Sequence, residues 1–195
     1  MPSLERGPGA ASSTPPRAAS DAAWPREGFL VRQRIAFEAP EQSGSFEAVV
    51  QERCGDLTIV GLAPFGTRAF TLRERDGEVT VEKHVPIPWP FPPAFIVRDV
   101  ARSLLVPLPE TSPNDGPRII RWRGEQVREL WRGGRLVERR FGSTGGASPD
   151  LEIIRFEEPG LGLGDPPPTL VIEDTRHGYA LRVVTLSRTK LACTQ

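Results

Sequence analysis

Glycine and proline divide this chain into short segments, and this punctuation limits the folds that it can adopt. The 195 residues include 19 glycines and 21 prolines, about a fifth of the sequence. Such frequent turn residues leave little room for long helices and favour many short strands. From Gly28 onward, short runs of Val, Ile, Leu, Phe and Thr alternate with polar residues, which is typical of strands with one buried face. The sequence therefore predicts a mainly β (α+β) fold.

This alternation predicts five strands in the first half of the chain. They span residues 29–37, 46–52, 56–62, 67–74 and 78–84. Asp76 and Gly77 lie between the last two strands and suit the positive φ angles of a type I′ hairpin turn. We expect Gly55 and Asp56 to turn the preceding hairpin.

A proline-rich segment, VPIPWPFPP at residues 85–93, interrupts the strands and cannot itself be a central strand. The segment that follows repeats apolar residues at helical spacing, at Phe95, Ile96, Val100, Leu104 and Leu105. This pattern predicts one main amphipathic helix at about 93–106, with Arg98, Asp99 and Arg102 elsewhere on its circumference.

Six further strands are predicted after the helix, which gives about eleven in all. They span residues 118–122, 125–131, 135–141, 151–158, 169–174 and 178–186. A single antiparallel sheet of this size must curl or close. The residues alone leave three solutions open: a second packed sheet, a closed barrel, or an open half-barrel with a cavity.

The first 27 residues differ from the rest of the chain. They are rich in Ala, Ser, Pro and Gly and show no apolar period, so they predict a disordered tail ahead of a single domain at 28–190. No run of about 18 apolar residues occurs, and no signal peptide or lipobox is visible in this sequence. The 25 basic and 25 acidic residues give a formal net charge of zero, which argues against a general binder of nucleic acid or anionic membranes.

Few residues suit catalysis or metal binding. His84 and His177 are the two histidines, and we expect both to be solvated rather than catalytic. Cys54 and Cys193 lie far apart and form no CxxC pair. Cys54 is interpreted as a plain strand-end residue rather than a reactive thiol. We therefore expect no enzyme, no metal and no cofactor.

Arginines with interleaved tryptophans crowd the segment from residue 118 to 140. The set comprises Arg118, Arg121, Arg123, Arg128, Arg132, Arg135, Arg139 and Arg140, with Trp122 and Trp131. Such a pattern can serve single-stranded nucleic acid. Because Glu125, Glu129 and Glu138 offset part of the charge, we favour a solvated sheet face and expect no nucleic-acid partner.

The segment LAPFG at residues 62–66 is an unusual hairpin tip. Leu62, Pro64 and Phe65 place apolar side chains where turns normally carry polar ones. Leaving a Phe exposed forfeits about 1.5–3 kcal/mol of burial. Two interpretations stay open at this point: Phe65 folds back onto the core, or it inserts into a membrane or a partner.

The order of these features resembles the LolA/LolB-like carriers and receptors of lipoproteins in Gram-negative outer membranes. The motifs VGLAPFGTRAFTLRERDGEVTVEKH and GYALRVVTL carry the resemblance, which covers about residues 28–187 and includes a group of lipoproteins whose domain has no assigned function. It implies a curled, unclosed antiparallel half-barrel with the helix lidding the concave face. It also implies that Phe65 takes the place of a protruding leucine in the tip.

The resemblance further implies a hydrophobic cavity for acyl chains. Candidate lining residues come from the inward face of the strands and from the helix: Phe46, Val50, Ile59, Phe70, Leu72, Phe95, Ile96, Val100, Leu104, Ile120, Trp122 and Leu181. The expected partners are an acylated lipoprotein or lipid and a membrane surface that the 62–66 loop contacts, and the protein is expected to be a monomer.

The expected location is the bacterial envelope, in the periplasm or on the periplasmic face of the outer membrane. The alternative is a structural or interaction module of the envelope that has this fold but no ligand cavity.

Overall fold

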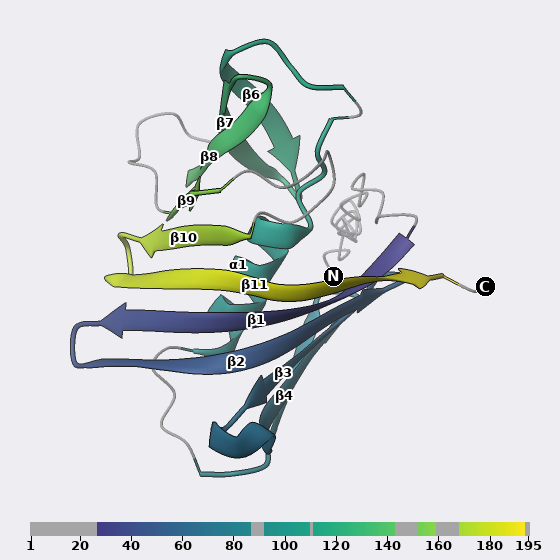
Figure 1. The fold of residues 1–195 in the computed structure, drawn as a ribbon, viewed down its shortest axis with the longest axis vertical. Coiled ribbons are helices and arrows are strands. Elements are labelled where there is room, and N and C mark those ends of the chain that lie inside the picture. Colours follow the sequence, from purple (N-terminus) through teal and green to yellow (C-terminus); the bar gives the residue numbers. More distant parts are fainter. Residues whose placement is uncertain (1–26, 87–91, 110, 143–151, 159–167, 194–195) are drawn as a thin grey trace, which may run out of the picture.

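The computed structural model describes residues 27–86, 92–109, 111–142, 152–158 and 168–193, and the structural statements below concern these residues (Figure 1). They form eleven β-strands and one α-helix. The strands are β1 (Glu27–Ala39), β2 (Gln42–Arg53), β3 (Asp56–Leu62), β4 (Arg68–Arg75), β5 (Glu78–Lys83), β6 (Gly116–Trp122), β7 (Glu125–Arg132), β8 (Arg135–Gly142), β9 (Glu152–Phe156), β10 (Thr169–Asp174) and β11 (Tyr179–Ala192). The helix is α1 (Pro93–Leu104), and a short 3₁₀ turn, η1 (Pro64–Gly66), joins β3 to β4.

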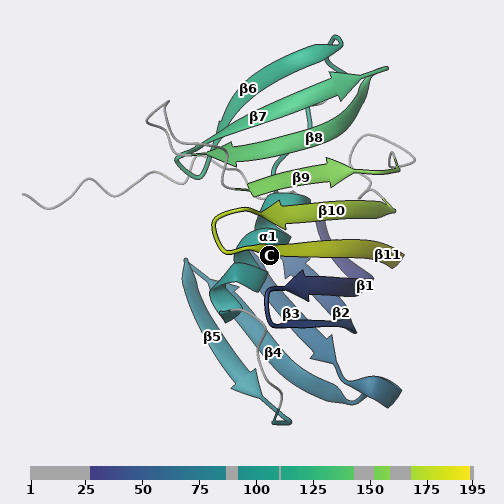
Figure 2. The ribbon, with the colours of Figure 1, turned by 90° about the vertical axis from the view of Figure 1, so that its left-hand side faces the viewer.

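All eleven strands belong to one antiparallel sheet in the order β5-β4-β3-β2-β1-β11-β10-β9-β8-β7-β6. Its edges are β5 and β6, which do not pair with each other among the described residues, so the sheet is open. The sheet curls strongly, and α1 lies on the inner side of the curl (Figures 1 and 2). The predicted unclosed, mainly β fold with one main helix is therefore confirmed, and the closed barrel and the second packed sheet are not adopted.

The strand boundaries follow the alternation of the sequence. On β1, Phe29, Val31 and Ile35 point to the buried side. Arg32 and Arg34 point outward, where both pair with Glu47 of β2. Burial of one face thus fixes the register of each strand, because a shift of one residue would expose its apolar side chains.

Two-residue turns close four of the hairpins, and each turn has positive φ at both residues. The four pairs are Cys54–Gly55, Asp76–Gly77, Arg123–Gly124 and Gly133–Gly134. This backbone suits the right-handed twist of the flanking strands. The turns predicted at residues 76–77 and 133–134 are confirmed. The turn after β2 lies one residue earlier than predicted, because Asp56 already belongs to β3.

Helix α1 begins at Pro93, directly after Pro92, and packs on the inner side of the curled sheet. Proline is tolerated in the first turn because its missing N–H would have no helical partner there. The apolar residues Ile96, Val97 and Val100 are buried, and Asp99 is buried as well. The helix therefore has little solvent-facing surface, and the charged residues predicted elsewhere on its circumference lie largely inside the protein.

A disulfide joins Cys54, in the turn after β2, to Cys193, which follows β11. These two strands flank β1 on either side. The bond links positions 139 residues apart, with 5.5 Å between the two Cα atoms. The sequence analysis interpreted Cys54 as a plain strand-end residue rather than a reactive thiol and did not predict this bond, which the structure adds.

Some predictions fall outside the described residues. They concern the tail at 1–26, most of the proline-rich segment at 85–93 and most of the glycine- and proline-rich stretch at 160–168. Within the described part, no helix is both long and apolar enough to cross a membrane.

Candidate functional site

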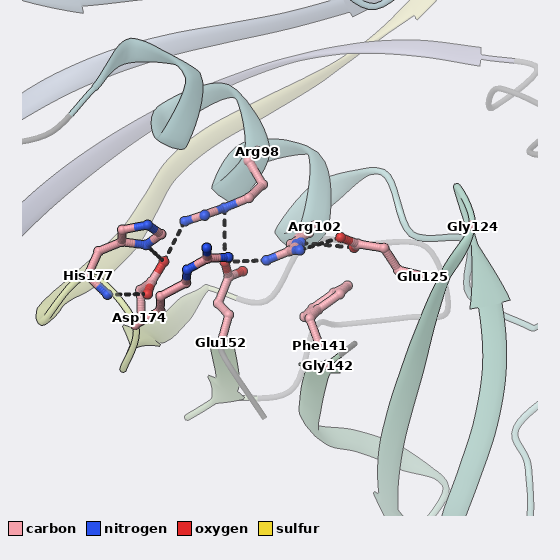
Figure 3. A pocket seen from close by; sticks show the side chains of 10 residues that line it. Arg98, Arg102, Gly124, Glu125, Phe141, Gly142, Glu152, Asp174 and His177 are labelled. Carbon is pink, nitrogen blue, oxygen red and sulfur yellow. Dashed lines mark hydrogen bonds and ion pairs between the residues drawn. The ribbon is translucent and has the colours of Figure 1, made fainter. Parts of the chain in front are cut away.

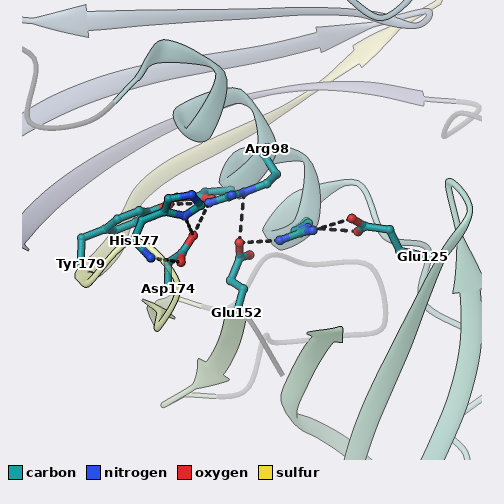
Figure 4. Close-up of polar contacts among 8 residues, drawn as sticks. Arg98, Glu125, Glu152, Asp174, His177 and Tyr179 are labelled. Carbon is teal, nitrogen blue, oxygen red and sulfur yellow. Dashed lines mark hydrogen bonds and ion pairs between the residues drawn. The ribbon is translucent and has the colours of Figure 1, made fainter. Parts of the chain in front are cut away.

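Arg98 of α1 lies at the centre of a buried polar cluster on the inner side of the sheet (Figure 4). Its Nη2 donates hydrogen bonds to Oδ2 of Asp174 at 2.7 Å, to the hydroxyl of Tyr179 at 2.6 Å and to Oδ1 of Asp99 at 2.9 Å. The Tyr179 hydroxyl in turn donates to Oδ2 of Asp99 at 2.6 Å. Two strands, β10 and β11, are thereby tied to one helical side chain.

Arg102, one turn further along α1, extends the same cluster. Its Nη1 donates to Oε2 of Glu152 on β9 at 2.6 Å, and its Nε donates to Oε2 of Glu125 on β7 at 3.1 Å. Nε of Arg98 lies 3.2 Å from the same Oε2 of Glu152. We call Arg98, Asp99, Arg102, Glu125, Glu152, Asp174, His177 and Tyr179 the anchoring cluster, because it fixes α1 to four strands.

The carboxyl groups of this cluster outnumber its arginines, and this imbalance changes their protonation. Burial and the charge of Asp99 raise the pKa of Glu152 to about 7, despite the two arginines beside it. Burial also raises the pKa of Asp99. Both arginines are bound by the same oxygen of Glu152, and its other oxygen, Oε1, is buried with no hydrogen-bond partner. The cluster therefore has room for an additional proton.

Asp174, the last residue of β10, and His177, in the turn that follows, form the outer end of the cluster. Nδ1 of His177 lies 2.8 Å from Oδ2 of Asp174, and the backbone N–H of His177 donates to Oδ1 at 2.9 Å. Although burial opposes the charge of Asp174, the hydrogen bonds from His177 lower its pKa. The ring of His177 also lies 4.1 Å from that of Phe95 on α1.

Two hollows adjoin the anchoring cluster. The first, of about 250 Å³, is drawn in Figure 3 and is lined by Arg98, Arg102, Gly124, Glu125, Phe141, Gly142, Glu152, Asp174, Arg176 and His177. The second, of about 210 Å³, lies between α1, β4, β5 and the β6–β7 turn, and is lined by Glu74, Val79, Ala94, Val97, Arg98, Ala101, Arg102, Trp122, Arg123 and Glu125. Both are smaller than the roughly 300–1,000 Å³ typical of ligand pockets, and charged side chains line much of each.

The twelve cavity-lining candidates lie together, but as a packed core. Eight are buried: Val50, Ile59, Phe70, Leu72, Ile96, Val100, Trp122 and Leu181. Phe46, Phe95, Leu104 and Ile120 are partly buried and pack against that core. Of the twelve, Trp122 alone lines one of the two hollows. The candidates thus lie in or against the core, whereas the first hollow is lined mainly by polar residues that were not among them.

Phe65, at the apolar tip, lies at the surface. Phe65 of η1 is 104% exposed relative to a free residue, so it does not fold back onto the core. Its φ is +70° and Gly66 beside it has φ of +78°. Leu62, at the end of β3, is partly buried. The sharp left-handed turn therefore directs the Phe65 side chain away from the protein.

The two histidines occupy different settings. His84 follows β5, and its Nε2 lies 3.1 Å from Oγ1 of Thr71. His177 lines the first hollow, but none of the described residues that line it is a Ser, Thr or Cys that His177 could activate. No group of three or more His, Cys, Asp or Glu side chains within the described ranges is arranged to hold a metal ion.

The arginine-rich segment contains one side chain that contradicts the predicted solvated face. Arg139 of β8 is 2% exposed. Its Nε donates to Oε1 of Glu129 at 3.0 Å, and Nε1 of Trp131 donates to the other oxygen at 3.1 Å. Arg139 lies on the inner face because it follows the alternation of β8, in which Phe141 is also buried. The other seven arginines of the segment are exposed.

Sequence reasoning missed the anchoring cluster. Its members are separated by up to 81 residues, as between Arg98 and Tyr179, and only a few, such as Asp174 and His177, are close in the sequence. The sequence contained one signal for the cluster. Arg98 and Arg102 are one turn apart on the predicted helix, and a curled sheet that surrounds the helix would bury both.

Three solved structures are similar to this chain to different degrees. The solved structure of a LolA superfamily protein, NE2245 from Nitrosomonas europaea, is similar over 91% of this chain and 91% of its own, with 16% identity and a TM-score of 0.50. A domain described as an outer membrane lipoprotein-sorting protein, from Vibrio parahaemolyticus, covers 86% of this chain and 87% of its own at 9% identity and a TM-score of 0.42. A DUF1329 family protein from Desulfovibrio piger covers 84% and 85% at 7% identity and a TM-score of 0.39.

The first of these likenesses confirms the fold that the sequence motifs predicted. No curated protein matches the chain in sequence. One family does match, over residues 30–187, which is most of the chain and includes every strand from β2 to β10. The chain therefore belongs to the family described as "Protein of unknown function (DUF3261)".

Proposed function

We propose that this protein is a non-enzymatic carrier or receptor that binds the acyl chains of lipoproteins or lipids and transfers them to or within the bacterial outer membrane. The observation that carries the proposal is the full exposure of Phe65 at the tip of η1. An aromatic side chain in this position loses the free energy of burial. Contact with hydrocarbon in a membrane or in an acylated partner would recover it.

The backbone at the tip supports the same function. A non-glycine residue at positive φ costs about 1–2 kcal/mol, and Phe65 adopts φ of +70°. The fold gains no packing from this conformation, because the side chain touches solvent. Strained residues that contribute no packing are concentrated at functional sites, and a loop that contacts lipid accounts for both the strain and the exposure.

The acyl chain itself would bind between α1 and the inner face of β2, β3 and β4. The side chains there are apolar, including Val50, Ile59 and Leu72 of the sheet and Ile96 and Val100 of the helix. Each methylene buried among them contributes about 0.8 kcal/mol. Because both hollows are small and the first is lined mainly by polar residues, we infer that α1 moves away from these strands when an acyl chain enters.

The location that we propose is the bacterial envelope. The disulfide between Cys54 and Cys193 is of the kind that persists in oxidising compartments such as the periplasm. The likeness in fold to a LolA superfamily protein is in keeping with that location. We propose that residues 28–190 act as one monomeric unit, with the 62–66 loop as the part that contacts the membrane.

Transfer of a fluorescent diacyl peptide from the protein to vesicles tests the role of the tip. Phe65→Glu should slow transfer at least tenfold without lowering the melting temperature, because Phe65 makes no core contact. Thr67→Glu, two residues away and also exposed, is the matched control and should transfer at the wild-type rate. Equal rates for wild type and Phe65→Glu would refute the proposal.

One set of observations favours a second function, an envelope interaction module without a ligand cavity. All twelve candidate cavity residues are packed in or against the core, and α1 is fixed by the anchoring cluster. This alternative predicts that no acyl probe is taken up even when α1 is loosened. The carrier proposal predicts uptake that increases when α1 is loosened.

A further inference from the structure

We propose that the outer face of strands β6, β7 and β8 binds a surface of anionic phospholipid headgroups. We call this surface the arginine face; it comprises Ile119, Arg121, Arg128, Arg132, Arg135 and Arg140. It is separate from the tip at Phe65, and the inference does not depend on the binding of acyl chains.

The pairing of the strands places these side chains together. Ile119 lies opposite Arg128 across β6 and β7, and Arg128 lies opposite Arg140 across β7 and β8. The alternate residues Val127 and Phe141 belong to the buried core on the inner side. The arginines of these strands therefore point away from α1, on the outside of the curl, in the upper part of Figure 2.

The arginine face places like charges directly opposite each other. Arg128 is directly opposite Arg140, and Arg132 is directly opposite Arg135. Like charges at directly opposite positions destabilise a sheet. Elsewhere on the outer surface of the same sheet, arginines face acidic partners, as Arg32 faces Glu47. These pairs concentrate positive charge on one face, which favours a binding partner of negative charge.

The charges on this face are poorly balanced among the described residues. Arg121, Arg132 and Arg135 are exposed and have no acidic partner there. Arg140 pairs with Glu138, which also lies 3.3 Å from Arg155. The formal net charge of the whole chain is zero, but the arginine face carries an excess of positive charge.

The apolar residue on the face helps to identify the partner. Ile119 is 64% exposed and lies on the edge strand β6 among the arginines. A guanidinium group binds a phosphate through two parallel hydrogen bonds. An exposed apolar side chain surrounded by basic ones is typical of proteins that bind at the interface of an anionic membrane.

The tryptophans argue against a nucleic acid. Single strands are bound by stacking bases on exposed aromatic rings. Trp122 and Trp131, the aromatic residues of β6 and β7, are buried on the opposite side of the sheet. The arginine face therefore offers phosphate contacts without a stacking surface.

The arginine face and the tip lie at opposite ends of the molecule. In both ribbon views, η1 is at the lower end and strands β6 to β8 are at the upper end (Figures 1 and 2). One contact can therefore be removed without disturbing the other.

Co-sedimentation with vesicles tests the proposal. The test variant is Arg128→Gln with Arg132→Gln. The control is Arg73→Gln with Arg182→Gln, which removes the same charge from exposed residues that pair with Glu82 and Glu157. The vesicles are pure phosphatidylcholine, or phosphatidylcholine with 30% phosphatidylglycerol.

We expect the wild-type protein to bind the anionic vesicles, to bind the neutral ones at least tenfold more weakly, and to be released by salt. Each arginine lost should weaken binding by about fivefold, so the test variant should bind about 25-fold more weakly and the control should be unchanged. The melting temperature of the test variant should stay close to that of the wild type, because both substituted residues are exposed.

Equal binding of wild type and test variant, or equal binding to neutral and anionic vesicles, would overturn the proposal. Tighter binding to single-stranded DNA than to anionic vesicles would overturn it as well. If the double variant melts at a lower temperature, Arg121→Gln on the edge strand gives the same test with less disturbance. The tip variant Phe65→Glu should still bind anionic vesicles, which separates this surface from the acyl-transfer function.

Discussion

Arg123, in the β6–β7 turn, donates a hydrogen bond from Nη1 to Oε1 of Glu74 on β4 at 3.1 Å. The two residues belong to opposite ends of the sheet order. The curl therefore brings the two arms of the open sheet into contact across α1, although no strand pairing joins them. The side chain of Glu74 is nearly buried, and its Oε2 has no partner, so the contact is the main support for a buried charge.

Removing this contact should loosen the protein. Arg123→Met keeps the aliphatic stem but removes the charge. We expect a loss of about 1 kcal/mol in the free energy of unfolding, because the arginine is about one-third exposed and solvent screens the pair. Arg75→Met is the control, since its pair with Asp56 is more exposed, and it should lower the free energy of unfolding less than Arg123→Met does. If α1 must move for acyl chains to enter, Arg123→Met should also take up an acyl probe faster. Equal destabilisation by both variants would contradict this view of the contact.

Glu152 should make stability depend on pH. Its pKa is raised from 4.5 to about 7 by burial in the anchoring cluster. Between these two values the folded protein holds more protons than the unfolded chain, so the stability contributed by this group is present at low pH and is lost as the pH rises toward 7. Glu152→Gln should make this decline clearly smaller. Urea unfolding at pH 5, 6 and 7 measures it.

The neighbours of Glu152 set the control for that measurement. Burial raises the pKa of Asp99, so Asp99 also lowers stability as the pH rises. The pKa of Asp174 is lowered, so its effect on stability has the opposite sign. Asp174→Asn should therefore leave the decline between pH 5 and 7 in place. A wild-type protein whose stability rises steadily over that interval, with no difference from Glu152→Gln, would show that Glu152 is charged at pH 5.

The disulfide should contribute much of the stability. Cys54→Ser with Cys193→Ser should lower the free energy of unfolding by about 2–5 kcal/mol, mainly because the unfolded chain is no longer constrained. Thiol titration of the unfolded wild-type protein should detect no free thiol before reduction and two afterwards. Two free thiols in protein purified from the periplasm would contradict the pairing.

Phe65→Gly should separate stability from transfer. Glycine adopts positive φ without strain, so this variant should be as stable as the wild type or more stable by about 1 kcal/mol. It should nevertheless lose acyl transfer, because the aromatic side chain is gone. Thr67→Gly, at a residue with φ of −70°, should gain no stability. Loss of stability in Phe65→Gly would mean that Phe65 packs against the protein in solution.

The sequence predicted the strands well because each has one buried face, and the alternation of apolar residues records it directly. The turn at Asp76 and Gly77 was predicted for a similarly local reason, its positive φ angles. The exposure of Phe65 could not be decided, since an apolar residue in a turn is compatible with either location. The direction of the Phe65 side chain follows from the φ of +70° and from the position of the neighbouring strands, and the sequence shows neither.

Long-range pairing accounts for what the sequence did not reveal. Arg139 was grouped with exposed arginines because no residue close to it in the sequence reveals its partner. That partner is Glu129, which lies on the inner face of the sheet. The bond between Cys54 and Cys193 spans 139 residues and becomes visible only when the order of β1, β2 and β11 is known. The arginine face was visible as a cluster of charge, but its like-charge pairs depend on the register of β7 and β8.

The central claim is that acyl chains bind between α1 and the inner face of the sheet. Native mass spectrometry of delipidated protein, incubated with a palmitoylated peptide and with its unacylated counterpart, tests this claim most directly. The account predicts a one-to-one complex with the acylated peptide alone, and more of it for Arg123→Met than for wild type. No complex with the acylated peptide for either protein, or equal binding of both peptides, would contradict it.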